Sequence, residues 1–195
     1  MVKKQYSISP AGEKFLIPGQ NQYKAELNQL KKIVAVKRGQ GKEIVVVVGV
    51  GFVGAVMAAV IADATDKKGK PNKFVIGMQR PSTRSYWKIP LLNRGVSPIK
   101  SEDPEVGAII KRCVMEKKTL IATYTYDALK FADVVVIDVQ CDYLKESFGD
   151  CKTGSANMEA LEDSIAIIAE RISTNGEPLS RMEIIAATIP TKGPR

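Results

Sequence analysis

The chain alternates between short, mostly apolar runs and longer stretches in which apolar residues recur at helical spacing. The central run, Ile44–Val48, is rich in valine, and four more follow at residues 74–78, 119–122, 133–139 and 182–187. Runs with little polar alternation are typical of strands buried on both faces, as in a parallel sheet. The pattern therefore predicts five strands of this kind.

Amphipathic stretches lie between these runs and before the first of them. The predicted helices cover residues 21–38, an Ala-rich stretch ending near Ala64, residues 85–93 with a break at Pro90, a segment that follows an N-cap at Ser101–Pro104, residues 126–131 and residues 157–172. Strands that alternate with helices predict a Rossmann-type α/β fold, which is a doubly wound, mainly parallel sheet with helices on both faces.

Residues 1–41 are predicted to form an N-terminal extension, and residues 42–195 the α/β domain. The first 20 residues show little periodicity and are expected to be flexible or draped over the domain; they contain Pro10, Gly12, Pro18 and Gly19. The helix at 21–38 carries an apolar stripe of Tyr23, Leu27, Leu30 and Val34. That stripe packs either on the main domain or on a partner chain, and packing on the main domain is the simpler expectation.

A glycine-rich turn joins the first strand to the Ala-rich helix. Gly49, Gly51 and Gly54 form the pattern G-x-G-x-x-G directly after the strand. In a dinucleotide-binding turn the first glycine makes the tight turn, the second lets the backbone approach a pyrophosphate, and the third lets the helix pack closely. The unpaired N–H groups of the helix N-terminus then bind the anion. The alternative is a tight strand-to-helix turn that binds no ligand.

The second strand ends where a Rossmann site usually holds a carboxylate for the adenosine ribose. Here the strand runs into Gln79 and Arg80, and Arg84 follows in the next loop. Two arginines suit a 2′-phosphate, so NADP is a candidate cofactor beside NAD. In the alternative, Gln79 contacts the ribose, and both arginines are surface residues or stack on adenine.

Composition narrows the function classes. The chain of 195 residues has a formal net charge of +8 but no basic tract interleaved with aromatics, which disfavours nucleic acid as a partner. It has no histidine, so neither a Ser-His nor a Cys-His catalytic pair is expected, and its three cysteines, Cys113, Cys141 and Cys151, have no metal-ligand spacing. No apolar run is long enough to cross a membrane and no signal peptide is evident, so a cytoplasmic protein is expected.

Several segments together resemble the N-terminal NAD-binding domain of the UDP-glucose/GDP-mannose dehydrogenase family, the nucleotide-sugar dehydrogenases. The resemblance covers roughly residues 42–191. The matching segments are Val48–Gly54 (V-G-V-G-F-V-G), Phe74–Gly77, Leu92–Ile99 (L-N-R-G-V-S-P-I), Asp103–Val106, Val135–Cys141 and Thr188–Pro190 (T-I-P). The Leu92–Ile99 segment makes the match specific, because many dehydrogenases share the glycine turn alone.

The resemblance implies an oxidoreductase of polysaccharide biosynthesis that oxidises the C6 alcohol of a UDP- or GDP-sugar to the uronic acid with NAD. It implies that the pyrophosphate is held by Gly49, Gly51, Phe52, Val53 and Gly54. It also implies that Gln79, Arg80 and Arg84 lie near the adenosine ribose, that Val139, Gln140 and Cys141 lie near the nicotinamide, and that Thr188 faces the substrate cleft. The family's threonine is replaced by Cys141, which raises the question of whether that thiol contacts the cofactor or is simply a small buried residue.

The family's catalytic thiol, lysine and asparagine lie in central and C-terminal sugar-nucleotide domains that extend beyond Arg195. We therefore expect this chain to bind the cofactor without catalysing the reaction alone, and expect the nucleotide sugar to bind only where those domains are supplied. A fragment, a truncated product, one subunit of a split dehydrogenase and a stand-alone dinucleotide-binding module all fit this expectation, as does a homo-oligomer.

Overall fold

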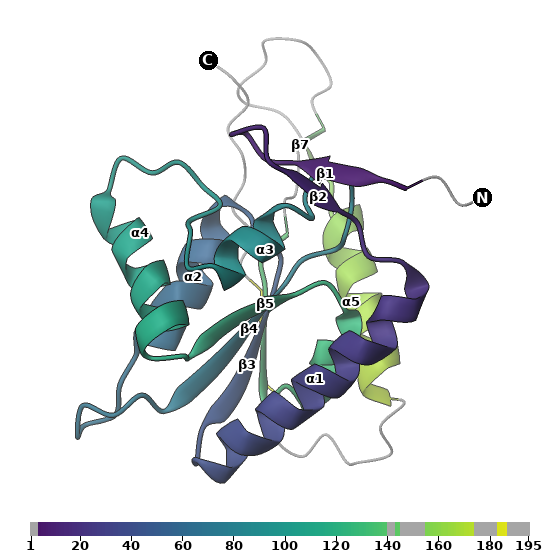
Figure 1. The fold of residues 1–195 in the computed structure, drawn as a ribbon. Helices are drawn as coiled ribbons and strands as arrows, with labels where there is room; N and C mark the ends of the chain where they lie inside the picture. Colours follow the sequence, from purple (N-terminus) through teal and green to yellow (C-terminus); the bar gives the residue numbers. More distant parts are fainter. Residues whose placement is uncertain (1–3, 140–142, 145–154, 174–182, 187–195) are drawn as a thin grey trace.

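A five-stranded parallel sheet forms the centre of the molecule (Figure 1). The structure is a computed structural model and describes residues 4–139, 143–144, 155–173 and 183–186. The strand order is β5-β4-β3-β6-β9, with β3 (Glu43–Val48), β4 (Lys73–Met78), β5 (Leu120–Thr123), β6 (Val134–Ile137) and β9 (Glu183–Ala186). The chain winds outward from β3 first to one side and then to the other, as in a doubly wound fold. The prediction of a Rossmann-type α/β fold is confirmed.

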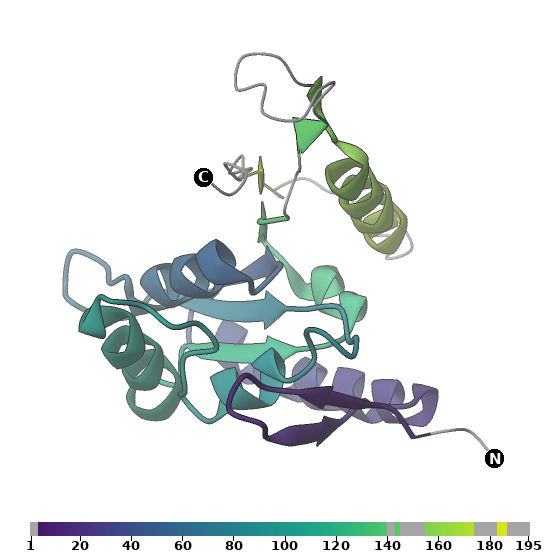
Figure 2. The same ribbon diagram turned by 90° about the horizontal axis from the view of Figure 1, so that it is seen from above.

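Helices cover both faces of this sheet. The helical elements are α1 (Gln20–Gly39), α2 (Phe52–Asp63), α3 (Lys88–Asn93), α4 (Pro104–Lys111), the π-helical turn η1 (Arg112–Glu116), the 3₁₀ helix η2 (Tyr126–Phe131) and α5 (Glu159–Ser173). Viewed from above, α2 lies on one side of the strands and α1 on the other (Figure 2). None of the helices in the described part of the chain is both long and apolar enough to span a membrane.

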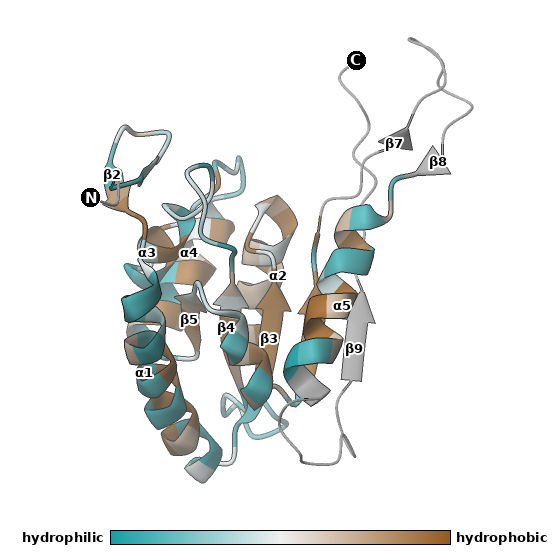
Figure 3. Ribbon diagram, turned by 90° about the vertical axis from the view of Figure 1, so that its right-hand side faces the viewer, coloured by the Kyte–Doolittle hydropathy of each residue, from teal (hydrophilic) through white to brown (hydrophobic). Residues whose placement is uncertain are grey.

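The valine run of β3 is buried on both faces because each face meets a layer of helices. Ile44, Val46 and Val48 belong to the core beneath α1, η2 and α5, whereas Val45 and Val47 belong to the core beneath α2 and α4. Hydropathy colouring shows β3 as apolar and the helices as apolar toward the sheet (Figure 3). This two-sided burial explains why the strand lacks alternating polar residues.

The two helices nearest the central strand approach it differently. Helix α2 buries only alanines and one glycine, which lets it lie close to the sheet: Gly54, Ala55, Ala58, Ala59 and Ala62. Helix α1 buries Leu30 and Val34 from its predicted stripe in the core of the opposite face. The expectation that α1 packs on the main domain is therefore confirmed.

Of the two alternatives for the first 20 residues, flexible or draped over the domain, the described residues from position 4 onward fit the second. Strands β1 (Tyr6–Ile8) and β2 (Lys14–Leu16) form an antiparallel hairpin. Ser7 and Phe15 point inward and are buried. Three-residue strands are too short to show periodicity, and contacts with residues some 80 positions away in the chain hold this hairpin in place.

One smaller expectation needs correction. Pro90 does not break its helix, because it stands in the first turn of α3, where a proline costs no intrahelical hydrogen bond. After β6, the short strands β7 (Tyr143–Leu144) and β8 (Ser155–Ala156) form an antiparallel pair that the sequence pattern does not predict. Two-residue strands leave no pattern in the sequence.

An ionic cluster joins α2 to η1. Asp63, at the end of α2, accepts two hydrogen bonds of 3.0 Å from the Arg112 guanidinium and one of 2.7 Å from Lys117 Nζ. The Arg112 guanidinium, helped by Lys117, holds the pKa of Asp63 well below its usual range. The cluster fixes α2 at the end opposite to the glycine turn.

Candidate functional site

The glycine turn lies where the two halves of the sheet diverge. Gly49 follows β3 and donates its N–H to Met78 O at 2.8 Å, and Asp138, which follows β6, donates its N–H to Val48 O at 2.8 Å. The carboxyl ends of β3, β4 and β6 thus meet around the turn. In doubly wound folds this switch point is the place where ligands bind.

Close packing within the protein itself accounts for the first and third glycines. Gly49 has a φ of +94°, and a Cβ built there would lie 2.0 Å from Asp138 O. A Cβ on Gly54 would lie 1.9 Å from Gly49 O and 2.6 Å from Asp138 Oδ2. These two positions require glycine whether or not a ligand binds.

The second glycine is different because packing places no demand on it. Gly51 is the N-cap of α2 with a φ of −76° and a ψ of −153°, an extended conformation that other residues adopt. A Cβ built there meets nothing within 4 Å among the residues that the structure describes. The absence of a side chain leaves the space in front of the α2 N-terminus open.

That space faces backbone donors. The N–H groups of Gly51, Phe52 and Val53 have no acceptor in the described part of the chain, whereas Ala55 N–H reaches Gly51 O at 3.3 Å. Unpaired N–H groups and the positive end of the helix dipole favour an anion here. The arrangement fits a pyrophosphate, and no bound metal is needed to provide positive potential.

A carboxylate stands beside these donors. Asp138 accepts a hydrogen bond from Gly54 N–H, and its half-buried position raises the pKa of its carboxyl group more than that bond lowers it. Sequence reasoning missed this residue because it lies inside the strand predicted at 133–139. The available signal was a single acidic residue near the end of an otherwise apolar run.

The residue predicted to contact the adenosine ribose faces the turn. Gln79 Oε1 accepts a hydrogen bond of 3.1 Å from Val50 N–H, so its amide braces the glycine turn from the end of β4. Arg80 and Arg84 are exposed in the loop that follows. The structure therefore brings Gln79 to the turn and places both arginines at the same end of β4.

The predicted nicotinamide side is described only in part. Val139 follows Asp138 and packs against the core beneath α5 and η2. Gln140, Cys141 and Thr188 lie outside the described residues. Their predicted roles stay predictions.

Cys113 cannot act as a nucleophile where it stands. Its side chain is fully buried, with Sγ 3.4 Å from Ala59 O, and burial raises the pKa of the thiol to about 11. A thiol with such a pKa is almost wholly protonated at neutral pH. Cys113 is a core residue.

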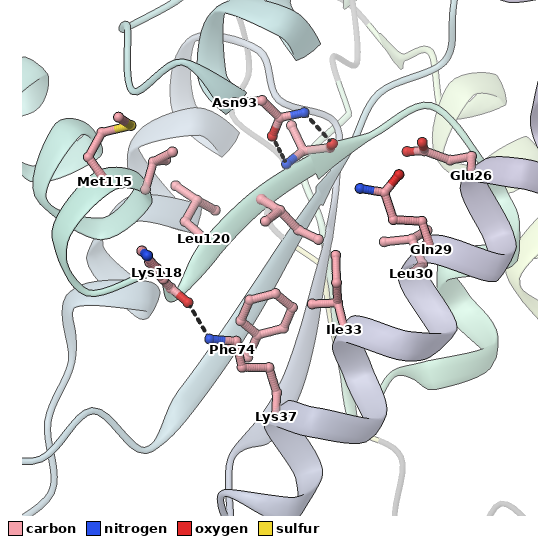
Figure 4. A pocket seen from close by; sticks show the side chains of 13 residues that line it. Glu26, Gln29, Leu30, Ile33, Lys37, Phe74, Asn93, Met115, Lys118 and Leu120 are labelled. Atoms are coloured by element: carbon pink, nitrogen blue, oxygen red, sulfur yellow. Dashed lines mark hydrogen bonds between the residues drawn. The ribbon is translucent and has the colours of Figure 1, made fainter.

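A groove of about 540 Å³ lies at the β5 edge of the sheet, between α1 and η1 (Figure 4). Two side chains form hydrogen bonds with backbone groups along this groove. The Asn93 amide pairs with both Ala122 N–H and Ala122 O, at 2.7 and 2.9 Å, and Lys37 Nζ donates to Lys118 O at 2.7 Å. Covering backbone groups in this way protects an edge strand from pairing with another chain. Asn93 of the L-N-R-G-V-S-P-I segment therefore has a structural role.

The chain is similar to solved structures of known proteins. Neither a protein-family model nor a curated protein sequence matches the chain. Among similar solved structures is the NDP-N-acetyl-D-galactosaminuronic acid dehydrogenase from Methanosarcina mazei Go1. It is 25% identical with a TM-score of 0.59, and the match covers 82% of this chain but 30% of that one.

A second similar structure is a UDP-D-ManNAc dehydrogenase from Pyrococcus horikoshii. It is 23% identical with a TM-score of 0.51, and the match covers 73% of this chain and 28% of that one. At this identity the likeness shows a shared fold alone. The chain spans less than a third of the length of either enzyme.

Proposed function

Because the chain resembles the nucleotide-sugar dehydrogenases in its motifs and in its fold, we propose that it is the nicotinamide-dinucleotide-binding part of such an enzyme. The α/β domain at 42–195 binds the cofactor, and residues 1–41 form an extension that packs on it. The complete enzyme oxidises the C6 alcohol of a nucleotide sugar to the acid, and the cofactor, when bound, accepts the hydride.

One observation carries this proposal. Three neighbouring N–H groups at the switch point, those of Gly51, Phe52 and Val53, have no acceptor among the described residues, and a Cβ built on Gly51 would meet nothing within 4 Å there. A pyrophosphate would satisfy them, whereas a turn that had only a structural purpose would have no need to leave the space before Gly51 empty.

In this proposal the other predicted site residues surround these three N–H groups. Gly49 and Gly54 shape the turn, while Arg80 and Arg84 flank the adenosine ribose and Gln79 braces the turn beside it. In sequence order after β6, Val139, Gln140 and Cys141 line the nicotinamide side, and Thr188 faces the substrate. The chain's own residues bind and orient the cofactor, and the nucleophile for the aldehyde stage comes from outside the described residues.

Titration of the purified chain with reduced nicotinamide dinucleotides tests this proposal. Nicotinamide fluorescence should rise to a one-to-one end point with NADH, with NADPH or with both. UDP- and GDP-sugars, added with oxidised cofactor, should give no turnover by the chain alone. Failure to bind any dinucleotide would overturn the proposal. Turnover would show instead that the chain supplies its own catalytic groups.

Asp138→Asn should strengthen binding of the reduced dinucleotide about fivefold at pH 7.5. Asparagine keeps an oxygen for Gly54 N–H and removes a negative charge beside the pyrophosphate, worth roughly 1 kcal/mol at this partly exposed position. Burial raises the pKa of Asp138, and a bound anion raises it further, so binding takes up a proton. Wild-type affinity should therefore rise as the pH falls, and the variant should lose this dependence. Identical pH profiles of the dissociation constant would contradict the assignment.

A further inference from the structure

The loop after β4 carries two arginines that differ from the others in the described part of the chain. That part contains six arginines, and four of them have a carboxylate partner: Arg38 with Asp133, Arg94 with Glu13, Arg112 with Asp63 and Arg171 with Asp127. Arg80 and Arg84 have no carboxylate partner among the described residues, and both are exposed. Two exposed guanidinium groups in one loop without a carboxylate partner favour an anion.

The backbone of this loop is held rigidly. Ser85 Oγ donates to Arg80 O at 2.8 Å, and Ser85 Oγ lies 2.7 Å from Ser82 Oγ. Trp87 Nε1 donates to Arg84 O at 2.9 Å. The carbonyl groups of both arginines are thus fixed, which lowers the entropic cost of binding a ligand.

The N-terminal hairpin holds the same loop from outside. Ser7, buried in the hairpin, donates its hydroxyl to Thr83 O at 2.9 Å and accepts from Trp87 N–H at 3.1 Å. The hairpin is anchored in turn at Arg94, which pairs with Glu13 at 2.6 Å and lies 5.4 Å above the Phe15 ring. The loop therefore has a defined shape before any ligand binds.

Gln79, the residue just before this loop, also favours a phosphate ligand. A carboxylate at the end of the second strand binds the ribose hydroxyls and repels a phosphate on the 2′ oxygen. Position 79 holds an uncharged amide, and its oxygen is already engaged by Val50 N–H. Nothing at this position opposes a 2′-phosphate.

We propose that Arg80 and Arg84 bind the 2′-phosphate of the adenosine ribose, so that the chain selects NADP(H) over NAD(H). This inference rests on the proposed dinucleotide-binding function and names the cofactor that the site takes. The guanidinium groups would provide charge-assisted hydrogen bonds to a phosphate dianion, which NAD(H) lacks.

The test compares the dissociation constants of NADPH and NADH for the intact chain and three variants. Wild type should bind NADPH at least tenfold more tightly than NADH. Arg80→Ala should weaken NADPH binding at least tenfold and change NADH binding less than threefold. Gln79→Glu, which keeps an oxygen for Val50 N–H, should reverse the preference. Lys31→Ala, a matched control, removes an exposed positive charge from α1 and should leave the ratio unchanged.

Adenosine fragments give a second measurement that does not depend on the nicotinamide. Adenosine 2′,5′-bisphosphate should compete with NADPH more strongly than adenosine 5′-phosphate, and Arg80→Ala should reduce the difference, because only Arg84 then remains to bind the 2′-phosphate. If NADH binds as tightly as NADPH, or if Arg80→Ala weakens both equally, the selectivity inference fails while the proposed function stands. If neither dinucleotide binds, the proposed function itself fails.

Discussion

Gly54→Ala is expected to lower the free energy of unfolding by about 3–5 kcal/mol, a large fraction of the stability of a domain this size. The added Cβ would lie 1.9 Å from Gly49 O, and that atom belongs to backbone that cannot rotate aside. To relieve this clash, α2 would have to move away from the sheet by roughly 1 Å or more. Such a movement would separate four buried alanines from β3 and β4.

Chemical denaturation of the variant, followed by circular dichroism, measures this effect. Gly107→Ala is the matched control, because Gly107 lies in α4, with nothing within 4 Å of a Cβ built on it. Alanine there should leave stability unchanged or raise it by up to about 1 kcal/mol. If Gly54→Ala unfolds at the denaturant concentration of the wild type, α2 does not pack on the turn as closely as described.

Local pattern was enough to predict the architecture of the sheet and most of its helices. The valine run of β3, the alanines of α2 and the stripe of α1 each report burial directly, because a side chain buried on a known face must be apolar. The N-cap at Asp103, whose carboxylate accepts Glu105 N–H at 2.9 Å, also follows from residue type and spacing. These features depend on neighbours within one or two turns of the chain.

Features that depend on distant contacts could not be predicted in the same way. The hairpin at β1 and β2 is fixed by Ser7, whose partners lie in the loop before α3. The direction of the Gln79 amide is set by Val50 N–H, which becomes available only after the glycine turn has formed. A serine or glutamine carries no sequence signal that states which backbone group it will bind.

The candidate site also contains one feature that the sequence predicts and one that it does not. The spacing of Gly49, Gly51 and Gly54 predicts the turn, but three glycines in a motif look alike in sequence. Only the folded backbone distinguishes them, because two glycines avoid clashes within the protein and the third leaves space for a ligand. Function is therefore tested most directly at Gly51, where a substitution need not disturb the fold.

Gly51→Val is expected to fold like the wild type and to bind the reduced dinucleotide about 100-fold more weakly. Its extended conformation is open to any residue, and the new side chain would enter the space at the α2 N-terminus, where a Cβ meets nothing within 4 Å among the described residues. A pyrophosphate displaced from these donors loses one or two charge-assisted hydrogen bonds, about 2–4 kcal/mol in total.

Two measurements together decide this result. The thermal midpoint of Gly51→Val should stay close to that of the wild type, since an N-cap change from glycine costs at most about 1 kcal/mol. Fluorescence titration should then show the loss of affinity, while Gly107→Ala binds normally. Gly51→Ala, with its smaller side chain, should lie between the wild type and the valine variant. A folded valine variant that binds with wild-type affinity would mean that the pyrophosphate does not bind at this turn, because a branched side chain and a phosphate cannot share the space in front of the α2 N-terminus.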